Sequence, residues 1–195
     1  MRAVLFTALS FCLAGEAYCI DNPDVMIKVG DPAPTFEAKD HDGKIWNSEE
    51  HYGKKVVVIY FYPADLTGGC TKQACGFRDQ YAELEKSGVE VIGVSGDSPE
   101  NHRLFRELHK LNFSLLADED GKVARTFGVP VREGATITKN IDGVEKTLTR
   151  GVTASRWTFV VGLDGKVIHK NTSVNAAEDS KTVLEAIRLL ATSGE

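Results

Sequence analysis

The segment VVVIYFYPADLTGGCTKQAC, residues 56–75, decides how this chain folds and where its chemistry lies. It begins with an unbroken run of β-branched and aromatic residues, which is typical of a central strand buried on both faces. Residues 63–69 contain Pro and Gly and predict a loop. From Cys70 to about Lys86, apolar side chains recur at helical spacing, and Gly88 follows as a stop signal. The segment therefore predicts a buried strand, a loop and a helix in direct succession.

Outward from this segment, strand and helix patterns alternate. Two Asp-Gly pairs predict the turns of hairpins, and Ser-Pro predicts the start of a helix. These patterns lie at residues 42–43, 89–94, 98–111, 113–116, 122–127, 157–170 and 177–190. Alternating strands and helices require crossover connections, hence a parallel centre, and the late hairpin adds an antiparallel edge. The prediction is an α/β fold: a thioredoxin-like sandwich whose mixed central sheet is flanked by helices, with an N-terminal β-hairpin extension.

Composition restricts the classes of partner. The 195 residues include 23 Lys and Arg against 28 Asp and Glu, a net charge of −5 at pH 7. No basic cluster interrupts this acidic balance, so we expect no nucleic-acid partner. The 4 Cys are too few for a disulfide scaffold but enough for a redox or metal site.

The N-terminus has the pattern of a secretory signal. A positive charge precedes an apolar run at residues 3–14, and small residues follow near candidate cleavage points after residue 17 or 19. The run is shorter than the roughly 20 residues that span a bilayer, so we expect no stable membrane association. We predict a signal peptide at residues 1–19, a mature domain at residues 20–195, and an exported location, either periplasmic or secreted. An N-terminal core helix is the alternative.

Two cysteines lie where chemistry is expected. Cys70 stands at the junction of the predicted loop and helix, at the carboxyl end of a buried strand, where α/β sheets place their sites. The helix start favours thiolate, the nucleophilic form. Cys75 follows five positions later, and helical residues at that spacing are roughly 8–9 Å apart between Cα atoms, too far for a disulfide. A bond between them would require the first helical turns to unwind, and core packing is the alternative for either thiol.

The stretch from Pro63 to Cys70 resembles the P-x-x-x-T-x-x-C motif of the peroxiredoxins. Further segments resemble the bacterioferritin-comigratory-protein (PrxQ) subfamily of these AhpC/TSA-type redoxins. They are ACGFRD at residues 74–79, VSGDS at 94–98, LLAD at 115–118 and FGV at 127–129. Similarity runs from about Val29 to the last helix. The resemblance implies a thiol-dependent peroxidase that reduces hydrogen peroxide and organic hydroperoxides and needs no cofactor and no metal.

The resemblance also implies a role for each candidate site residue. Cys70 would be the peroxidatic cysteine, which attacks the O–O bond and becomes a sulfenic acid. Cys75 would be the resolving cysteine, which condenses with that acid into an intramolecular disulfide. Thr67 would hydrogen-bond the peroxide, Pro63 would shield the pocket, and Arg156 would direct its guanidinium at the thiolate. A thioredoxin-like donor would reduce the disulfide, and the subfamily pattern favours a monomer.

Two features depart from the subfamily pattern. Gly68 and Gly69 stand where the family often has Pro-Gly, so the loop is expected to be looser and the pocket less preorganised. Residues 130–153 form a longer insertion, in which β-favouring segments flank the turn Asp142-Gly143 and predict an extra hairpin. A tolerated surface insertion is the favoured interpretation, and a role in shaping substrate access or a partner surface is the alternative.

Two other functions fit the predicted fold. A copper(I) carrier would use the soft thiolates of Cys70 and Cys75. Such carriers pair C-x-x-x-C with a distant His, whereas the spacing here is C-x-x-x-x-C. A general dithiol oxidoreductase usually needs C-x-x-C, which is absent. The 5 His residues show no convergent ligand spacing, and we expect His102 and His109 to be solvated.

Overall fold

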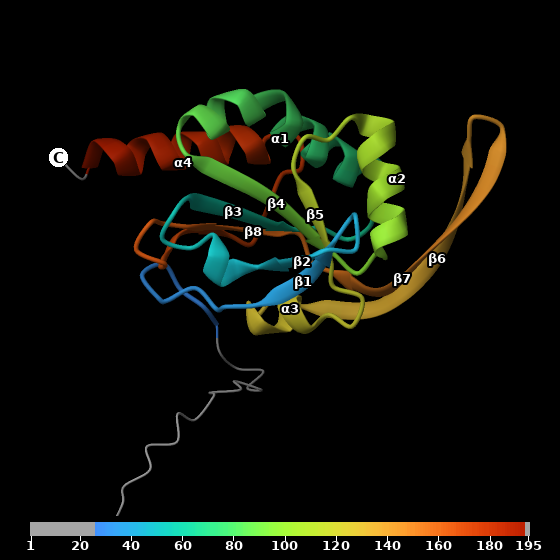
Figure 1. Ribbon diagram of the computed structural model, residues 1–195, viewed down its shortest axis with the longest axis horizontal. Coiled ribbons are helices and arrows are strands. Elements are labelled where there is room, and N and C mark those ends of the chain that lie inside the picture. Colours follow the sequence, from blue (N-terminus) through green and yellow to red (C-terminus); the bar gives the residue numbers. More distant parts are fainter. Residues whose placement is uncertain (1–25, 194–195) are drawn as a thin grey trace, which may run out of the picture.

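The computed structural model describes residues 26–193, and a seven-stranded mixed sheet forms their centre (Figure 1). The predicted signal peptide lies outside the described residues. Within them, no helix is both long enough and apolar enough to cross a bilayer. The elements in chain order are β1 (Glu37–Asp40), β2 (Ile45–Asn47), a 3-10 turn (Ser48–Glu50), β3 (Val56–Phe61), α1 (Gly68–Lys86), β4 (Val89–Ser95), α2 (Pro99–His109), β5 (Ser114–Ala117), α3 (Lys122–Thr126), β6 (Val131–Ile141), β7 (Val144–Ala154), β8 (Trp157–Val161), β9 (Val167–Asn171) and α4 (Asp179–Ser193).

The strand order of the main sheet is β2-β1-β5-β4-β3-β8-β9. β3, β4 and β5 run parallel, whereas β8 and β9 on one side and β1 and β2 on the other are antiparallel to their neighbours. The predicted parallel centre and antiparallel late hairpin are therefore confirmed. β3 lies inside the sheet, between its parallel neighbour β4 and the antiparallel β8, and the loop that follows it leaves from the carboxyl edge of the parallel strands.

The side chains of β3 alternate between two hydrophobic cores. Val58 and Tyr60 pack with α1, α2 and α4 on one face of the sheet. Ile59 and Phe61 pack with α3 and the N-terminal β1–β2 hairpin on the other face. Helix α1 buries Cys70, Ala74 and Phe77 in the first core, which holds the N-terminal half of the helix against the sheet.

A two-stranded ribbon of β6 and β7 extends away from the main sheet (Figure 1). Its turn places Asp142 at φ 51° and Gly143 at φ 85°, the left-handed geometry that tight hairpin turns require. The hairpin predicted around these residues is present. At the base of the ribbon, the Gly151 amide donates to the carbonyl oxygen of Gly96 at 2.9 Å. This contact joins the ribbon to the loop that follows β4.

The loop after β3 is shorter than predicted, because α1 begins at Gly68 rather than at Cys70. Gly68 and Gly69 belong to the first helical turn, and the Thr71 amide donates to the carbonyl oxygen of Thr67 at 2.8 Å. The expectation of a loose loop at the two glycines is therefore wrong. A helical hydrogen bond spans them.

Candidate active site

Cys70 lies in the first turn of α1 and is 1% exposed. Thr67 takes the N-cap position in an extended conformation, with φ −96° and ψ 148°, but its side chain does not cap the helix. Its hydroxyl donates instead to the carbonyl oxygen of Ala64 at 3.0 Å. The first-turn N–H groups therefore have no side-chain cap. This positive end of the helix favours negative charge near Cys70.

Arg156 immediately precedes β8, and its side chain reaches the first turn of α1. Its Nη2 donates to the Sγ atom of Cys70 at 3.2 Å. The side chain is half-buried, so bulk water screens the interaction less than it would at an exposed site. A fixed cation beside the sulfur stabilises the thiolate over the thiol. The structure thus brings together two predicted site residues that lie 86 positions apart in the sequence.

Gln73 is a site residue that the sequence analysis missed. It is 1% exposed, and its Oε1 accepts a hydrogen bond from Nη1 of Arg156. Gln73 follows Cys70 by three positions on α1, so both side chains point to one face of the helix. This spacing was the signal available in the sequence.

Pro63 and Thr67 are half-buried in the loop that joins β3 to α1. Because Thr67 is at the N-cap of the helix that carries Cys70, its hydroxyl lies on the same loop–helix junction as the sulfur. The hydroxyl can donate to one oxygen and accept from another. Its role toward a peroxide, like the shielding role of Pro63, stays a prediction.

Replacing Thr67 with Val is expected to lower kcat/KM for peroxide by about tenfold, the value of one hydrogen bond. Val keeps the shape of Thr but has no hydroxyl. Thr67→Ser keeps the hydroxyl and is the matched control, with kcat/KM expected within about threefold of wild type. Steady-state peroxide consumption measures both variants. A Val variant as active as wild type would show that the hydroxyl only serves the Ala64 carbonyl.

Cys75 is half-buried on α1, and both Cys70 and Cys75 are free thiols. The helix runs without interruption from Gly68 to Lys86, so both cysteines are helical. At helical spacing their Cα atoms are too far apart for a disulfide, and bonding would require the first turns of α1 to unwind. The intramolecular disulfide therefore stays a prediction.

A buried polar cluster holds the loop that precedes α1. Tyr62 donates from its hydroxyl to Asp65 Oδ1 at 2.7 Å, and the Asp65 amide donates to Asp97 Oδ2 at 3.0 Å. The other Asp65 oxygen lies 2.8 Å from Nδ1 of His102. The next residue, Leu66, takes φ 55°, which is unusual for a residue other than glycine and persists where surrounding contacts hold it.

The expectation of a solvated His102 is wrong, because this side chain is 0% exposed. Helix α2 turns it inward against Asp65, which the loop supplies from 37 positions earlier in the chain. A buried imidazole is stable there because the carboxylate pairs with it. The spacing of residues along α2 could not indicate Asp65 as a partner, because Asp65 lies on a different element.

His102→Leu is expected to destabilise the fold by about 3–5 kcal/mol near pH 6, because it leaves the Asp65 carboxylate buried without its partner. Burial lowers the pKa of His102, but the charge and hydrogen bond of Asp65 outweigh burial, and the pKa is raised. A raised pKa contributes stability fully below the unfolded value of about 6.5, and this contribution is lost as the pH rises through the folded pKa. Denaturant unfolding should therefore show a smaller difference between wild type and variant above neutral pH. A difference that grows with pH would contradict the pairing.

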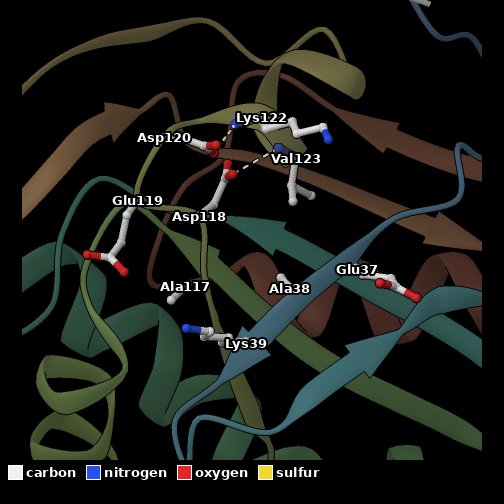
Figure 2. Close-up of a pocket in the computed structure, with 9 residues that line it drawn as sticks. All are labelled: Glu37, Ala38, Lys39, Ala117, Asp118, Glu119, Asp120, Lys122 and Val123. Atoms are coloured by element: carbon white, nitrogen blue, oxygen red, sulfur yellow. Dashed lines mark hydrogen bonds between the residues drawn. The ribbon is translucent and has the colours of Figure 1, made fainter. Parts of the chain in front are cut away.

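A separate cleft of about 320 Å³ lies between β1 and the segment from Ala117 to Val123 (Figure 2). None of the predicted site residues lines it. Asp118, a buried carboxylate that lines the cleft, accepts hydrogen bonds from the amides of Val123 and Ala124, each at 2.8 Å. Asp118 therefore serves the start of α3, and the cleft adds nothing to the site around Cys70.

The surroundings of Cys70 do not suit a metal cation. The guanidinium of Arg156 already lies 3.2 Å from the sulfur, and its positive charge opposes a second cation at that atom. Within residues 26–193, no group of three or more His, Cys, Asp or Glu side chains is arranged to hold a metal ion. The geometry therefore gives no support to a copper(I) carrier.

Comparison with known proteins gives one consistent family. The model of the AhpC/TSA family matches residues 29–170. A chloroplastic peroxiredoxin Q from Populus jackii is 50% identical over 104 residues, which are 53% of this chain and 48% of that protein. Peroxiredoxin Bcp of Escherichia coli K12 is 43% identical over 143 residues, 73% of this chain and 84% of that protein. The chain spans about half the length of the plant relatives it matches.

A solved structure of the Xanthomonas campestris bacterioferritin comigratory protein has the same fold. It superimposes with a TM-score of 0.67 at 29% identity, over 86% of this chain and 99% of that one. That structure is described in terms of the alkyl peroxide reduction activity of the Xanthomonas protein.

Proposed function

The chain belongs to the AhpC/TSA family, and from this premise we propose that it is a thiol-dependent peroxidase, an oxidoreductase that acts on peroxides. One observation carries the proposal: Arg156 Nη2 lies 3.2 Å from Cys70 Sγ at the start of α1. A thiolate held by a cation at a helix N-terminus is an activated nucleophile. No such pairing is needed for a cysteine that only fills space.

The first step consumes the peroxide. The Cys70 thiolate attacks one peroxide oxygen and the O–O bond breaks, so the sulfur becomes a sulfenic acid and the peroxide is reduced by two electrons. The other oxygen leaves with the bonding pair and takes a proton, which gives an alcohol, or water when the substrate is hydrogen peroxide. Arg156 stabilises the charge that spreads over the oxygens, and the Thr67 hydroxyl bonds the substrate.

The second step forms the disulfide. Once the first turns of α1 have unwound, the Cys75 thiolate attacks the sulfenic sulfur and the S–O bond breaks. The hydroxide that leaves takes a proton and becomes water. A thioredoxin-like dithiol then reduces the disulfide and is itself oxidised, which completes the cycle. Interception by Cys75 protects Cys70 from irreversible oxidation to sulfinic acid.

The substrates, the oligomeric state and the location of the protein are proposed from more specific observations. We propose hydrogen peroxide and organic hydroperoxides as substrates, and the alkyl peroxide reduction activity described for the Xanthomonas relative supports the second class. We propose that the chain is exported after cleavage of its signal peptide, residues 1–19, at position 17 or 19, on the pattern of those residues. We also propose a monomer, on the resemblance to the PrxQ subfamily. Residues 20–195 would then form the mature domain, with an insertion at about 130–153. The chloroplastic location of the plant relatives is a property of those proteins.

The test is the intact mass of the mature protein before and after one equivalent of hydrogen peroxide. The starting mass reports the cleavage site. A loss of about 2 Da with both thiols gone is expected, since it marks the intramolecular disulfide. A gain of about 16 Da would keep the peroxidase but remove Cys75 from the resolving role. No change in mass would overturn the proposed function.

A further inference from the structure

We propose that Asp179, the first residue of α4, is a positioning residue for the reactive thiol. It fixes the amide of Gln73, and the carbonyl oxygen of that amide fixes Arg156 beside Cys70. The proposal rests on the peroxidase function above and adds to it a residue that lies outside the motif around Cys70.

Asp179 is buried in an unusual way. It is 2% exposed, and a single carboxylate oxygen, Oδ2, accepts from Gln73 Nε2 at 2.7 Å and from Thr158 Oγ1 at 2.8 Å. Its other oxygen, Oδ1, is buried and has no hydrogen-bond partner within the described part of the chain. Burying a carboxylate is costly unless its hydrogen bonds compensate. The side-chain hydrogen bonds that compensate here come from Gln73 and from Thr158 of β8.

These contacts leave only one orientation for the amide of Gln73. A carboxylate can only accept hydrogen bonds, so the side of Gln73 that faces Asp179 must be its NH₂ group. A guanidinium can only donate, so the side that faces Arg156 must be the carbonyl oxygen. The reversed amide would place its NH₂ group against the guanidinium, donor against donor, and its carbonyl oxygen against the carboxylate, acceptor against acceptor. Asp179 therefore determines that Gln73 offers an acceptor to Arg156.

Arg156 needs such an acceptor because its long side chain is otherwise free to rotate. The hydrogen bonds of its side chain go to Gln73 and to the sulfur of Cys70. The contact with Gln73 fixes the guanidinium in the reduced enzyme, and the contact with Cys70 acts on the reacting sulfur. Groups that act on a reacting atom lose much of their effect when misplaced by about 1 Å.

The start of α4 lies close against the same part of α1. A Cβ atom added at Gly76 would lie 2.9 Å from Ser180 Oγ, so the helices approach more closely than a side chain at position 76 allows. Gln73 also lies between the two cysteines on α1. The hydrogen bond from Gln73 to Asp179 must therefore break when the first turns unwind to form the disulfide. Asp179 supports the step with peroxide but not the resolving step.

The first experiment compares Asp179→Ala with wild type in a single turnover without reductant. We expect Cys70 oxidation by hydrogen peroxide to slow by about ten- to a hundredfold, and disulfide formation to keep its rate or accelerate. Alkylation of Cys70 by iodoacetamide at the same pH should also slow. Glu185→Ala, an exposed position on the same helix, is the matched control. Unchanged oxidation and alkylation rates in a folded Asp179→Ala variant would overturn the proposal.

A reciprocal exchange tests the same contact where Asp179→Ala fails to fold. Gln73→Glu places a second carboxylate against Asp179, so it should slow Cys70 oxidation, and more so as the pH rises. Adding Asp179→Asn restores one donor and one acceptor with their places exchanged, and the rate should recover by about tenfold over Gln73→Glu alone. A double variant no faster than Gln73→Glu would overturn the positioning role.

The two proposals fail in different ways. If the wild-type enzyme does not consume peroxide, the peroxidase function is wrong, but the alkylation rates still report whether Asp179 positions Arg156. If wild type consumes peroxide while Asp179 and Gln73 variants match it, only the positioning role is wrong.

Discussion

Cys70→Ser is expected to abolish peroxide consumption, with kcat/KM reduced by at least about 10³-fold, as for loss of other catalytic nucleophiles. Serine differs from cysteine by one atom, so the first turn of α1 and its contact with Arg156 should survive. The hydroxyl, however, is not ionised at neutral pH and cannot be oxidised to the equivalent of a sulfenic acid. Peroxide consumption with a thioredoxin-type reductant in excess measures the loss.

Cys75→Ser is the matched control, because it removes the other free thiol of the same helix. This variant should react with one equivalent of peroxide at the wild-type rate and then stop, since its sulfenic acid has no internal partner. Residual turnover in Cys70→Ser that Cys75→Ser lacks would assign the peroxidatic role to Cys75 instead.

Arg156→Ala is expected to lower kcat/KM by about 10²–10³-fold, the usual loss when a preorganised donor to developing charge is removed. The guanidinium is the cation in hydrogen-bond contact with Cys70, and alanine leaves both the sulfur and Gln73 without it. Alkylation of Cys70 by iodoacetamide should slow together with peroxide consumption, because both reactions use the sulfur that the guanidinium contacts. The two rates are measured in parallel on the same preparation.

Arg156→Lys separates charge from geometry. An ammonium keeps the positive charge, but it lacks the planar fork that contacts Cys70 and Gln73 together. We expect its kcat/KM to lie between those of wild type and Arg156→Ala. Arg103→Ala, on the exposed side of α2, should not change either measurement. An Arg156→Ala variant with wild-type alkylation and peroxide rates would show that the 3.2 Å contact is incidental.

Local sequence patterns were sufficient for most of the fold. The run at residues 56–62 predicted β3, and the Asp-Gly turns predicted the hairpins, because strands and tight turns depend on residues close together in the chain. Ser98 caps α2 as predicted, since a cap bonds to the amide of Asn101 three residues later. The resemblance to the PrxQ subfamily is confirmed, as is the thioredoxin-like α/β sandwich.

The start of α1 was less predictable from the same kind of pattern. Two glycines are typical of a loop, yet Gly68 and Gly69 are helical here. Glycine has a low helix propensity, but packing of the apolar face of α1 on the sheet outweighs that local preference.

The succession of elements, the position of Cys70 at a helix start and the family therefore follow from patterns that are local in the chain. The packing of distant elements brings the polar partners together: Arg156 with Cys70, Asp65 with His102, and Asp179 with Gln73. These pairs lie 86, 37 and 106 positions apart. The physical reason is that a buried charge is stable only beside its partner, and packing of distant elements brings that partner there.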